Sequence, residues 1–364
     1  MSSAVSHGRP TTAAWLTTGC TVVHHPERCR NGFTCGSTGL GLNTARSDRW
    51  NLLLSRRGIA RKGTAVPYVS VPDGTEVFYT DDGAGPAVML SHSCWTDHDA
   101  WDGQVAALSS RFRVVCVDSR GHGPTRETDA PYDYWRLARD HLAVADHLGL
   151  NRFVAGGVSS GAMTGMHMAL LEPARIGGLV LIGTSATAYS DEEKSRWRDV
   201  LGVWLGDDDD LVKGFARALA AATIGGRRDV QMRWVTKWLA EDRQRMRNSF
   251  ACLINRPSLL PELARITCGA LLIRGAGDQA FSDENMITLR DNLGGPTSPL
   301  HTVEGANHLP NISHPEIVSD LIADFLERLD LGDSDHDIGV AVGRSRSQSD
   351  CAPQSNLAGA VTNS

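Results

Sequence analysis

The stretch Gly157-Val158-Ser159-Ser160-Gly161 separates a short apolar run, residues 152–156 (RFVAG), from a longer one, residues 162–171 (AMTGMHMALL). The first run is typical of a buried parallel strand, and the second is apolar nearly all round, like a helix packed against a sheet. A Gly-x-Ser-x-Gly sequence at such a junction predicts a turn so sharp that only glycine-sized neighbours fit. The turn presents the serine hydroxyl to a pocket with helix N–H groups behind it, so Ser159 is the first candidate catalytic residue.

Short apolar runs and helical stretches alternate along most of the chain on both sides of this turn. The apolar runs predict strands at residues 68–71, 75–80, 87–90, 113–118, 153–156, 178–182, 270–273 and 300–303. Helices are expected at residues 100–108, 134–148, 283–293 and 315–329, besides the helix that begins after Ser160. Repeated β-α units predict an α/β protein with a mostly parallel eight-stranded sheet and helices on both faces.

Residues 188–266 interrupt this alternation and are helical in character. Four tryptophans fall in this block: Trp197, Trp204, Trp234 and Trp238. We expect an inserted helical cap over the carboxyl edge of the sheet. The acidic run Asp207–Asp210 predicts a solvated helix start before Leu211 in preference to a cation site, because aspartates complement the positive end of a helix dipole.

The two ends of the chain differ from the middle, for which we predict one folded domain at residues 66–331. Residues 1–65 carry nine Lys and Arg against only two acidic residues and show no periodicity. We expect either an organellar targeting segment or a non-native extension there, disordered in both cases. Residues 332–364 are polar and predict a disordered tail. Since the whole chain has a net charge of −6, its folded part is clearly acidic, which argues against a nucleic-acid partner.

No apolar run predicts a membrane-spanning helix or a secretory signal, so we expect no membrane partner. The eight cysteines form no Cys-x-x-Cys pair, and no histidine pair completes a zinc site, so we expect no metal. Cysteines without a pairing pattern are typical of a reducing compartment, so we expect the protein in the cytoplasm. The alternative location is an organelle to which the N-terminal segment would direct the chain. The sequence leaves open whether the protein is a homo-oligomer.

A serine hydroxyl becomes a good nucleophile only when a base removes its proton and an acid orients that base. Asp278 ends the turn Arg-Gly-Ala-Gly-Asp after one predicted strand, and His308 ends Glu-Gly-Ala-Asn-His after the last. Both side chains are therefore expected at the carboxyl edge of the sheet. The chain order Ser159, Asp278, His308 is the order of a catalytic triad on one type of parallel sheet.

An acyl-transfer site also needs N–H donors for the oxyanion. One donor is expected from the backbone N–H of Ser160, just after the nucleophile. The second is expected from the loop after the third strand, where we nominate the N–H of Cys94. No base is assigned to the Cys94 thiol, so we expect it to line the pocket. Trp95 and His92 of the same loop are the candidate substrate-pocket residues.

Residues 67–330 resemble an α/β-hydrolase. The stretches that most resemble the 3-oxoadipate enol-lactonase branch and its esterase relatives are Ser91-His92-Ser93, Trp101-Asp102, Gln104-Val105 and Asp118-Ser119-Arg120-Gly121-His122-Gly123. The resemblance implies the nucleophile, acid and base roles for Ser159, Asp278 and His308, and the oxyanion roles for the amides of Cys94 and Ser160. The chain departs from the usual pattern at Ser93, where a glycine is common, and at Ser160, where a bulkier apolar residue is common.

These residues predict a serine hydrolase that cleaves a small-molecule carboxylic ester or lactone through an acyl-enzyme, with no cofactor. Three alternatives stay open: a carbon–carbon bond hydrolase, an acyltransferase on the same triad, and a ligand receptor with vestigial turnover. We expect a medium-sized, partly apolar substrate, because Trp95 and the cap tryptophans are suited to wall a pocket. A cap arginine turned inward would pair with a substrate carboxylate. The candidates are Arg227, Arg228, Arg233, Arg243, Arg245 and Arg247.

Overall fold

The fold is that of a computed structural model, which describes residues 67–329 and 331. The predicted extension at residues 1–65 and the predicted tail at 332–364 lie outside the described residues. Every strand and helix predicted from the sequence is present within the described part. The limits of the folded domain stay a prediction.

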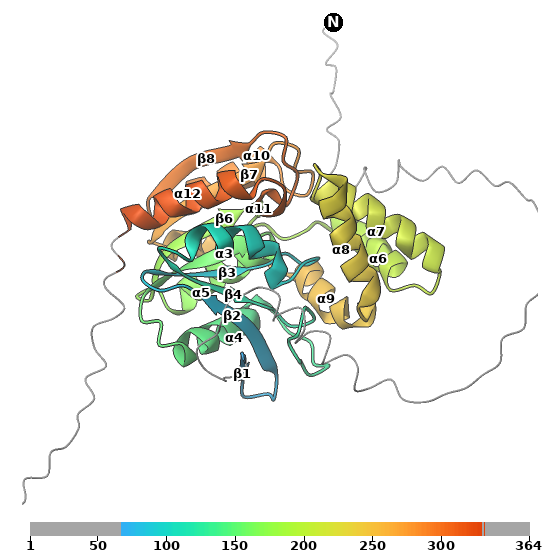
Figure 1. The fold of residues 1–364 in the computed structure, drawn as a ribbon, viewed down its shortest axis with the longest axis horizontal. Coiled ribbons are helices and arrows are strands. Elements are labelled where there is room, and N and C mark those ends of the chain that lie inside the picture. Colours follow the sequence, from blue (N-terminus) through green and yellow to red (C-terminus); the bar gives the residue numbers. More distant parts are fainter. Residues whose placement is uncertain (1–66, 330, 332–364) are drawn as a thin grey trace, which may run out of the picture. The chain divides into compact units, whose positions relative to one another are not determined.

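Eight strands form one sheet in the order β1-β2-β4-β3-β5-β6-β7-β8 (Figure 1). Their bounds are β1 Tyr68–Ser70, β2 Glu76–Asp82, β3 Ala87–Ser91, β4 Arg113–Val117, β5 Phe153–Val158, β6 Ile176–Ile182, β7 Gly269–Gly275 and β8 Thr297–Val303. The hairpin β1–β2 and the pair β2–β4 are antiparallel, and all other neighbouring strands are parallel. The predicted mostly parallel sheet is confirmed.

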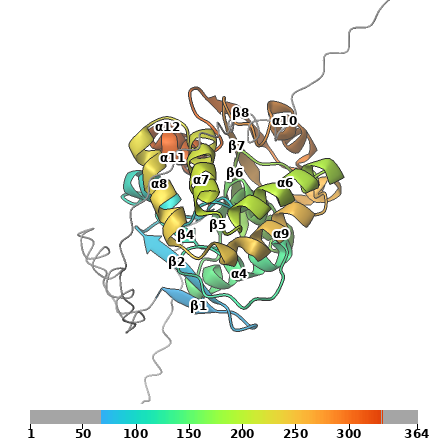
Figure 2. The same ribbon diagram turned by 90° about the vertical axis from the view of Figure 1, so that its right-hand side faces the viewer.

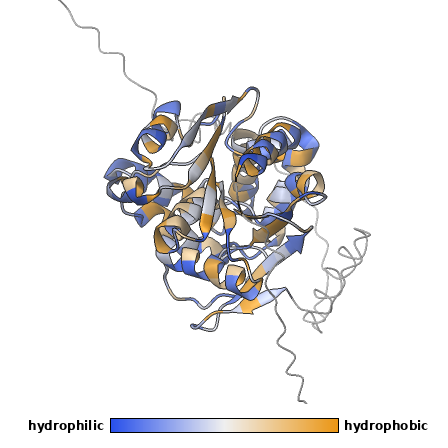
Figure 3. Cartoon of the chain, turned by 90° about the vertical axis from the view of Figure 1, so that its left-hand side faces the viewer, coloured by the Kyte–Doolittle hydropathy of each residue, from blue (hydrophilic) through white to orange (hydrophobic). Residues whose placement is uncertain are grey.

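The central strands are apolar runs because helices cover both faces of the sheet. Every residue of β3, β5 and β6 is buried. The helices α3 Asp102–Leu108 and α12 Pro315–Arg328 pack together on one face, and α4 Tyr134–His147 and α5 Ser160–Leu171 on the other (Figure 1). The other elements outside the inserted block are η1 His98–Trp101, η3 Leu260–Arg265, α10 Asp283–Asn292 and α11 Pro310–Ser313. Hydrophilic residues recur along the helices, while the central strands are more hydrophobic (Figure 3).

The predicted helical cap lies between β6 and β7 and stands in front of the sheet in Figure 2. It consists of α6 Asp191–Trp204, α7 Asp209–Thr223, α8 Arg228–Ala240, η2 Arg243–Met246 and α9 Arg247–Asn255. The acidic run is a helix start, as expected: the Asp208 carboxylate accepts the N–H groups of Asp210 and Leu211. The cap therefore covers the edge at which the parallel strands end.

Aromatic packing joins this cap to the loop after β3. The Trp95 ring lies edge-on to Trp204 and Phe250, with centroids 5.4 and 4.7 Å apart. The indole N–H of Trp238 donates to the carbonyl oxygen of Trp95, and Lys237 pairs with Asp99 at 2.7 Å. Three of the four cap tryptophans are buried in this packing, so they attach the cap to the core. No helix within residues 67–329 is both long and apolar enough to cross a membrane.

Candidate active site

Ser159 joins β5 to α5 with a φ of 58° and a ψ of −117°. It is the only non-glycine residue with a positive φ in the part of the chain that the structure describes. Such a conformation costs on the order of 1–3 kcal/mol and persists only where its surroundings enforce it. Here the Ser159 N–H donates to Ile182 at 2.8 Å, and the Ser159 carbonyl accepts the Thr184 hydroxyl at 3.0 Å. Both backbone polar groups of Ser159 are therefore bonded to residues at and just after the end of β6, and the strained backbone sets the direction of the hydroxyl.

The two glycines of the motif face the end of β3. A Cβ on Gly157 would lie 2.0 Å from the carbonyl oxygen of Ser91, and a Cβ on Gly161 would lie 2.2 Å from the same atom. Any other residue at either position would force the turn away from β3. The glycine spacing thus sets how closely the Ser159 turn approaches the loop that leaves β3.

Asp278 and His308 meet beyond the ends of β7 and β8. Nδ1 of His308 donates to Oδ2 of Asp278 at 2.9 Å, and both side chains are buried. The other carboxylate oxygen of Asp278 accepts the backbone N–H groups of Ala280 and Phe281 at 2.8 and 3.2 Å. Because both oxygens of its carboxylate are bonded, Asp278 holds the His308 ring in one orientation. The ring proton then lies on Nδ1, and Nε2 is left unprotonated.

The bonded pair of Asp278 and His308 lies beside the serine turn. A Cβ on Gly183, the residue after β6, would lie 2.8 Å from Oδ2 of Asp278 and 3.3 Å from Nδ1 of His308. The next residue, Thr184, is the one bonded to the Ser159 carbonyl. The structure therefore brings the three predicted residues to one place. Within the described residues, the hydroxyl of Ser159 makes no hydrogen bond to His308.

The two nominated amides are available to a ligand. Among the described residues, neither the N–H of Cys94 nor that of Ser160 has a hydrogen-bond acceptor. Ser160 opens α5, where the first N–H groups have no partner within the helix and carry the positive end of its dipole. Nε2 of His122 lies 2.7 Å from the Cys94 carbonyl oxygen, and this contact holds the peptide unit that follows the Cys94 N–H.

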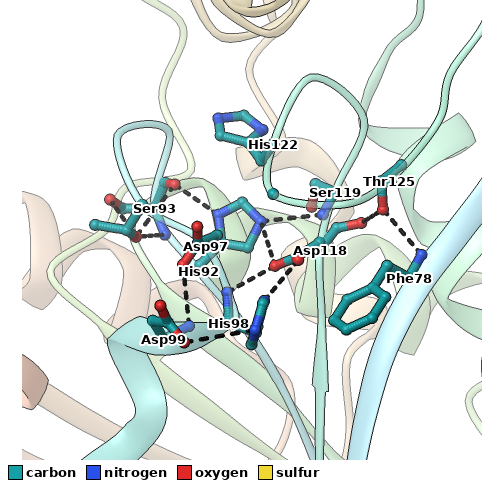
Figure 4. A network of polar contacts seen from close by, with 12 residues as sticks. Phe78, His92, Ser93, Asp97, His98, Asp99, Asp118, Ser119, His122 and Thr125 are labelled. Atoms are coloured by element: carbon teal, nitrogen blue, oxygen red, sulfur yellow. Dashed lines mark hydrogen bonds and ion pairs between the residues drawn. The ribbon is translucent and has the colours of Figure 1, made fainter. Parts of the chain in front are cut away.

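A buried polar network supports the loop after β3 (Figure 4). His92 donates from Nδ1 to the Ser93 carbonyl at 2.7 Å and accepts the Ser119 N–H at Nε2 at 3.0 Å. Burial holds the pKa of His92 well below its ordinary value, which suits a neutral ring with one donor and one acceptor. The His92 and His122 rings lie 4.7 Å apart. Both histidines therefore hold this loop in place.

Another histidine, His98, ties the turn after this loop to Asp118, the residue that follows β4. The Asp118 carboxylate accepts the backbone N–H of His98 at 2.6 Å and its ring Nδ1–H at 2.7 Å (Figure 4). Burial disfavours the charged ring, but the adjacent Asp118 carboxylate outweighs it and raises the pKa of His98 to about 9. This buried ion pair fixes the start of η1, immediately after the loop that carries Cys94.

Two cavities, of about 330 Å³ and about 20 Å³, lie in the described part of the chain, and neither is lined by Ser159, Asp278 or His308. Trp95 lines the smaller cavity, whereas His92 lines neither. Both ring nitrogens of His92 are bonded, to the Ser93 carbonyl and to the Ser119 N–H, and a pocket role for His92 stays a prediction. None of the six nominated cap arginines lines the larger cavity. The arginine that does is Arg256, which sequence reasoning missed.

Comparison with known proteins agrees with this fold. A family model described as the alpha/beta hydrolase fold matches residues 86–262. The non-heme haloperoxidase of Rhodococcus erythropolis is 38% identical over 120 residues, which are 32% of this chain and 44% of that protein. The match thus spans less than half of that relative. The 3-oxoadipate enol-lactonase 2 of Acinetobacter baylyi is 25% identical over 263 residues, covering 67% of this chain and 89% of that protein.

Among solved structures, the enol-lactonase from Burkholderia xenovorans LB400 aligns with a TM-score of 0.62 and 28% identity. The alignment covers 72% of this chain and all of that one, 100%. The predicted resemblance to enol-lactonases and esterases is therefore confirmed. From its sheet order and these comparisons, the chain has the α/β-hydrolase fold.

Proposed function

We propose that this protein is a serine hydrolase that cleaves a carboxylic ester or a lactone. The observation that carries the proposal is Ser159, a strained serine at a strand-to-helix turn. The bonded pair of Asp278 and His308 beside it supplies a base and its orienting acid. The amides of Cys94 and Ser160 lack acceptors among the described residues and are suited to receive a developing negative charge.

In the proposed reaction, the hydroxyl of Ser159 attacks the substrate carbonyl while Nε2 of His308 takes its proton. Asp278 keeps the ring in the tautomer with Nε2 free and stabilises the imidazolium that forms. His308 then protonates the leaving oxygen and next activates a water molecule against the acyl-enzyme. The hydrogen bond from the Ser159 hydroxyl to Nε2 of His308 forms as substrate binds, because catalytic hydrogen bonds tighten in the reacting complex.

Turnover of simple substrates tests this proposal. The purified chain is expected to hydrolyse para-nitrophenyl butyrate and small lactones, because its nucleophile, base and oxyanion donors need no partner protein. The rate of nitrophenolate release above the buffer rate is the measurement. If the chain hydrolysed neither esters nor lactones faster than the buffer does, the result would contradict the proposal and favour the receptor alternative.

Cys94→Ala is expected to retain most of the esterase activity. The proposed donor is the Cys94 backbone amide, which the substitution keeps. Burial raises the pKa of the Cys94 thiol to about 12, so the thiol is protonated and unreactive at neutral pH. The measurement is kcat/KM of the variant, together with inhibition of the wild type by iodoacetamide. A loss as deep as that of a triad variant would show that the thiol itself takes part.

His122→Ala is expected to lower kcat by about tenfold, with little change in KM. Complete loss of one oxyanion donor costs about 10²–10³-fold in kcat, and here the Cys94 amide would be loosened without being removed. His122→Gln restores a donor to the Cys94 carbonyl and is expected to recover part of the loss. His301→Ala on β8 is the matched control and should behave like the wild type. An equal loss in all three variants would contradict a positioning role for His122.

A further inference from the structure

The loop that carries His308 meets the cap at the C-terminal end of helix α7. The last carbonyl groups of a helix have no N–H partner within that helix. Here the Thr223 carbonyl accepts the backbone N–H of Leu309 at 2.9 Å, and the Ala221 carbonyl accepts the side-chain amide of Asn307 at 3.1 Å. The two donors are the residues on either side of His308. A cap helix therefore holds the loop of the proposed base at both of its flanking residues.

The side chain of Asn307 occupies a space that two glycines leave open. A Cβ on Gly225, in the linker after α7, would lie 2.7 Å from Nδ2 of Asn307. On the other side, a Cβ on Gly277, the residue before Asp278, would lie 2.5 Å from Oδ1 of Asn307. Backbone and side chain can approach so closely only because both glycines lack a Cβ. The Asn307 amide therefore lies between the cap and the turn that carries the proposed acid.

The base loop, residues 304–309, is also bonded to the acid turn, residues 274–278, through the backbone. The N–H of Gly277 donates to the Ala306 carbonyl at 2.8 Å, and the N–H of Ala276 donates to the Val303 carbonyl at 3.0 Å. Within the described residues, Asn307 is the one side chain of the base loop that hydrogen-bonds to the cap. The core thus holds one side of the base loop, and the cap holds the other.

The linker between α7 and α8 is itself held in place. Gly225 and Gly226 both lie in the left-handed region, with φ values of 66° and 60°. The side-chain amide of Gln231, on α8, donates to the carbonyls of both glycines at 3.0 and 3.3 Å. The two glycines differ in what they face, because a Cβ on Gly226 would meet only Cβ of Ser313, at an ordinary 3.8 Å. Gly225 alone of the two is therefore pressed against Asn307.

The bond between His308 and Asp278 fixes the orientation of the His308 ring, but the backbone of the base loop decides where the ring lies. A general base must come within hydrogen-bond reach of the hydroxyl from which it takes a proton. A misplacement of about 1 Å in such a site costs about 10²-fold in rate. The contacts of residues 307 and 309 with the end of α7 therefore affect the position on which the proposed proton transfer depends.

We infer that Asn307 is a positioning residue, which joins His308 to the cap helix α7. The base then lies in its working position only while the end of α7 is seated on the base loop. The inference rests on the proposed ester or lactone hydrolysis and adds a link between the cap and the base. A displacement of the cap would loosen His308 without breaking its bond to Asp278.

Asn307→Ala is expected to lower kcat for para-nitrophenyl butyrate by about tenfold with little change in KM, because the base is loosened and the substrate contacts are kept. Asn292→Ala is the matched control, since the Asn292 amide also donates to a helix carbonyl, that of Thr288 in α10, at 2.8 Å. The control should keep the wild-type kcat. Wild-type kcat in Asn307→Ala would overturn the inference and leave ester hydrolysis intact.

Two glycine variants test whether the effect comes from the cap. Gly225→Ala and Gly226→Ala place the same strain on a left-handed residue, but only the first pushes on Asn307. Gly225→Ala is expected to lower kcat by about three- to tenfold, and Gly226→Ala should behave like the wild type. In the Asn307→Ala background the new methyl group has room, so Gly225→Ala should cause no further loss. Equal kcat values in the two glycine variants, or fully additive losses, would overturn the inference.

Chemical modification of His308 tests the inference without turnover, so its outcome does not depend on the proposed reaction. Diethyl pyrocarbonate transfers an ethoxycarbonyl group to an unprotonated ring nitrogen, and peptide mass mapping follows the product on His308. The wild-type ring is buried and should react slowly. Asn307→Ala is expected to react about three- to tenfold faster, which is the shift that the loss of one hydrogen bond gives. Asn292→Ala should match the wild type. Equal rates in Asn307→Ala and the wild type would overturn the inference.

Discussion

Ser159→Ala is expected to lower kcat for ester hydrolysis by about 10⁴-fold or more, because nothing else in the site replaces its hydroxyl as nucleophile. The substitution removes one oxygen atom and keeps the backbone bonds from Ser159 to Ile182 and Thr184. The melting temperature should therefore stay close to that of the wild type. Steady-state kinetics with para-nitrophenyl butyrate, together with a thermal melt, measure both expectations.

Ser160→Ala is the matched control for this variant. Within the described residues its hydroxyl hydrogen-bonds only to the His92 carbonyl, at 3.4 Å, and the proposed role belongs to its backbone amide. The control should therefore retain most of its activity. A Ser159→Ala enzyme that kept even a tenth of the wild-type kcat would rule out Ser159 as the nucleophile.

His308→Ala is expected to be as severe as the serine variant, since a serine without its base stays a poor nucleophile. Asp278→Asn should be roughly tenfold milder, because the ring is then misoriented without being removed. A double variant of Ser159 and His308 should be no slower than either single variant, as expected for residues that act as a unit. The measurement is kcat for each variant with one ester.

Asp283→Asn is the control for the acid. Asp283 pairs with Arg274 at 2.8 Å, and its side chain is 62% exposed, so its loss should leave kcat nearly unchanged. A silent Asp278→Asn combined with an inactive Asp283→Asn would move the acid role to Asp283. An active His308→Ala would contradict the triad altogether.

The features that the sequence predicted well are those that depend on neighbours along the chain. The order of strands and helices follows from apolar periodicity and from the turn signals between the runs. The Gly157 to Gly161 motif predicts the Ser159 turn because its glycines are dictated by contact with a single atom, the Ser91 carbonyl oxygen. Asp278 and His308 could be nominated because both follow strands whose ends meet at one edge.

The walls of the cavity were not predictable in this way, because they come from segments far apart in the chain. Six cap arginines were nominated, yet the buried one is a seventh, Arg256. Its position depends on the end of α9 and on the distant Tyr189 ring, which no local pattern reports. The one available signal was Pro257, which marks the helix end and hence a residue that leaves the solvated helix surface.

Residues of the same loop also contact different groups. His92 was nominated for the pocket together with Trp95, but its ring is held between the Ser93 carbonyl and the Ser119 N–H. His122 lies in the loop after β4, and its contact with the Cys94 carbonyl places it behind the loop that carries the proposed oxyanion donor. Both outcomes depend on how two loops pack after β3 and β4, which spacing along the chain does not specify.

Covalent labelling tests the central claim most directly. A fluorophosphonate reagent reacts with an activated serine, forming a phosphorus–oxygen bond as fluoride leaves. We predict one adduct per chain, located by peptide mass mapping on Ser159, and its loss in Ser159→Ala. His308→Ala should label far more slowly, because the base is missing. A wild-type chain that hydrolyses esters yet stays unlabelled at Ser159, or is inactivated by labelling elsewhere, would contradict the account.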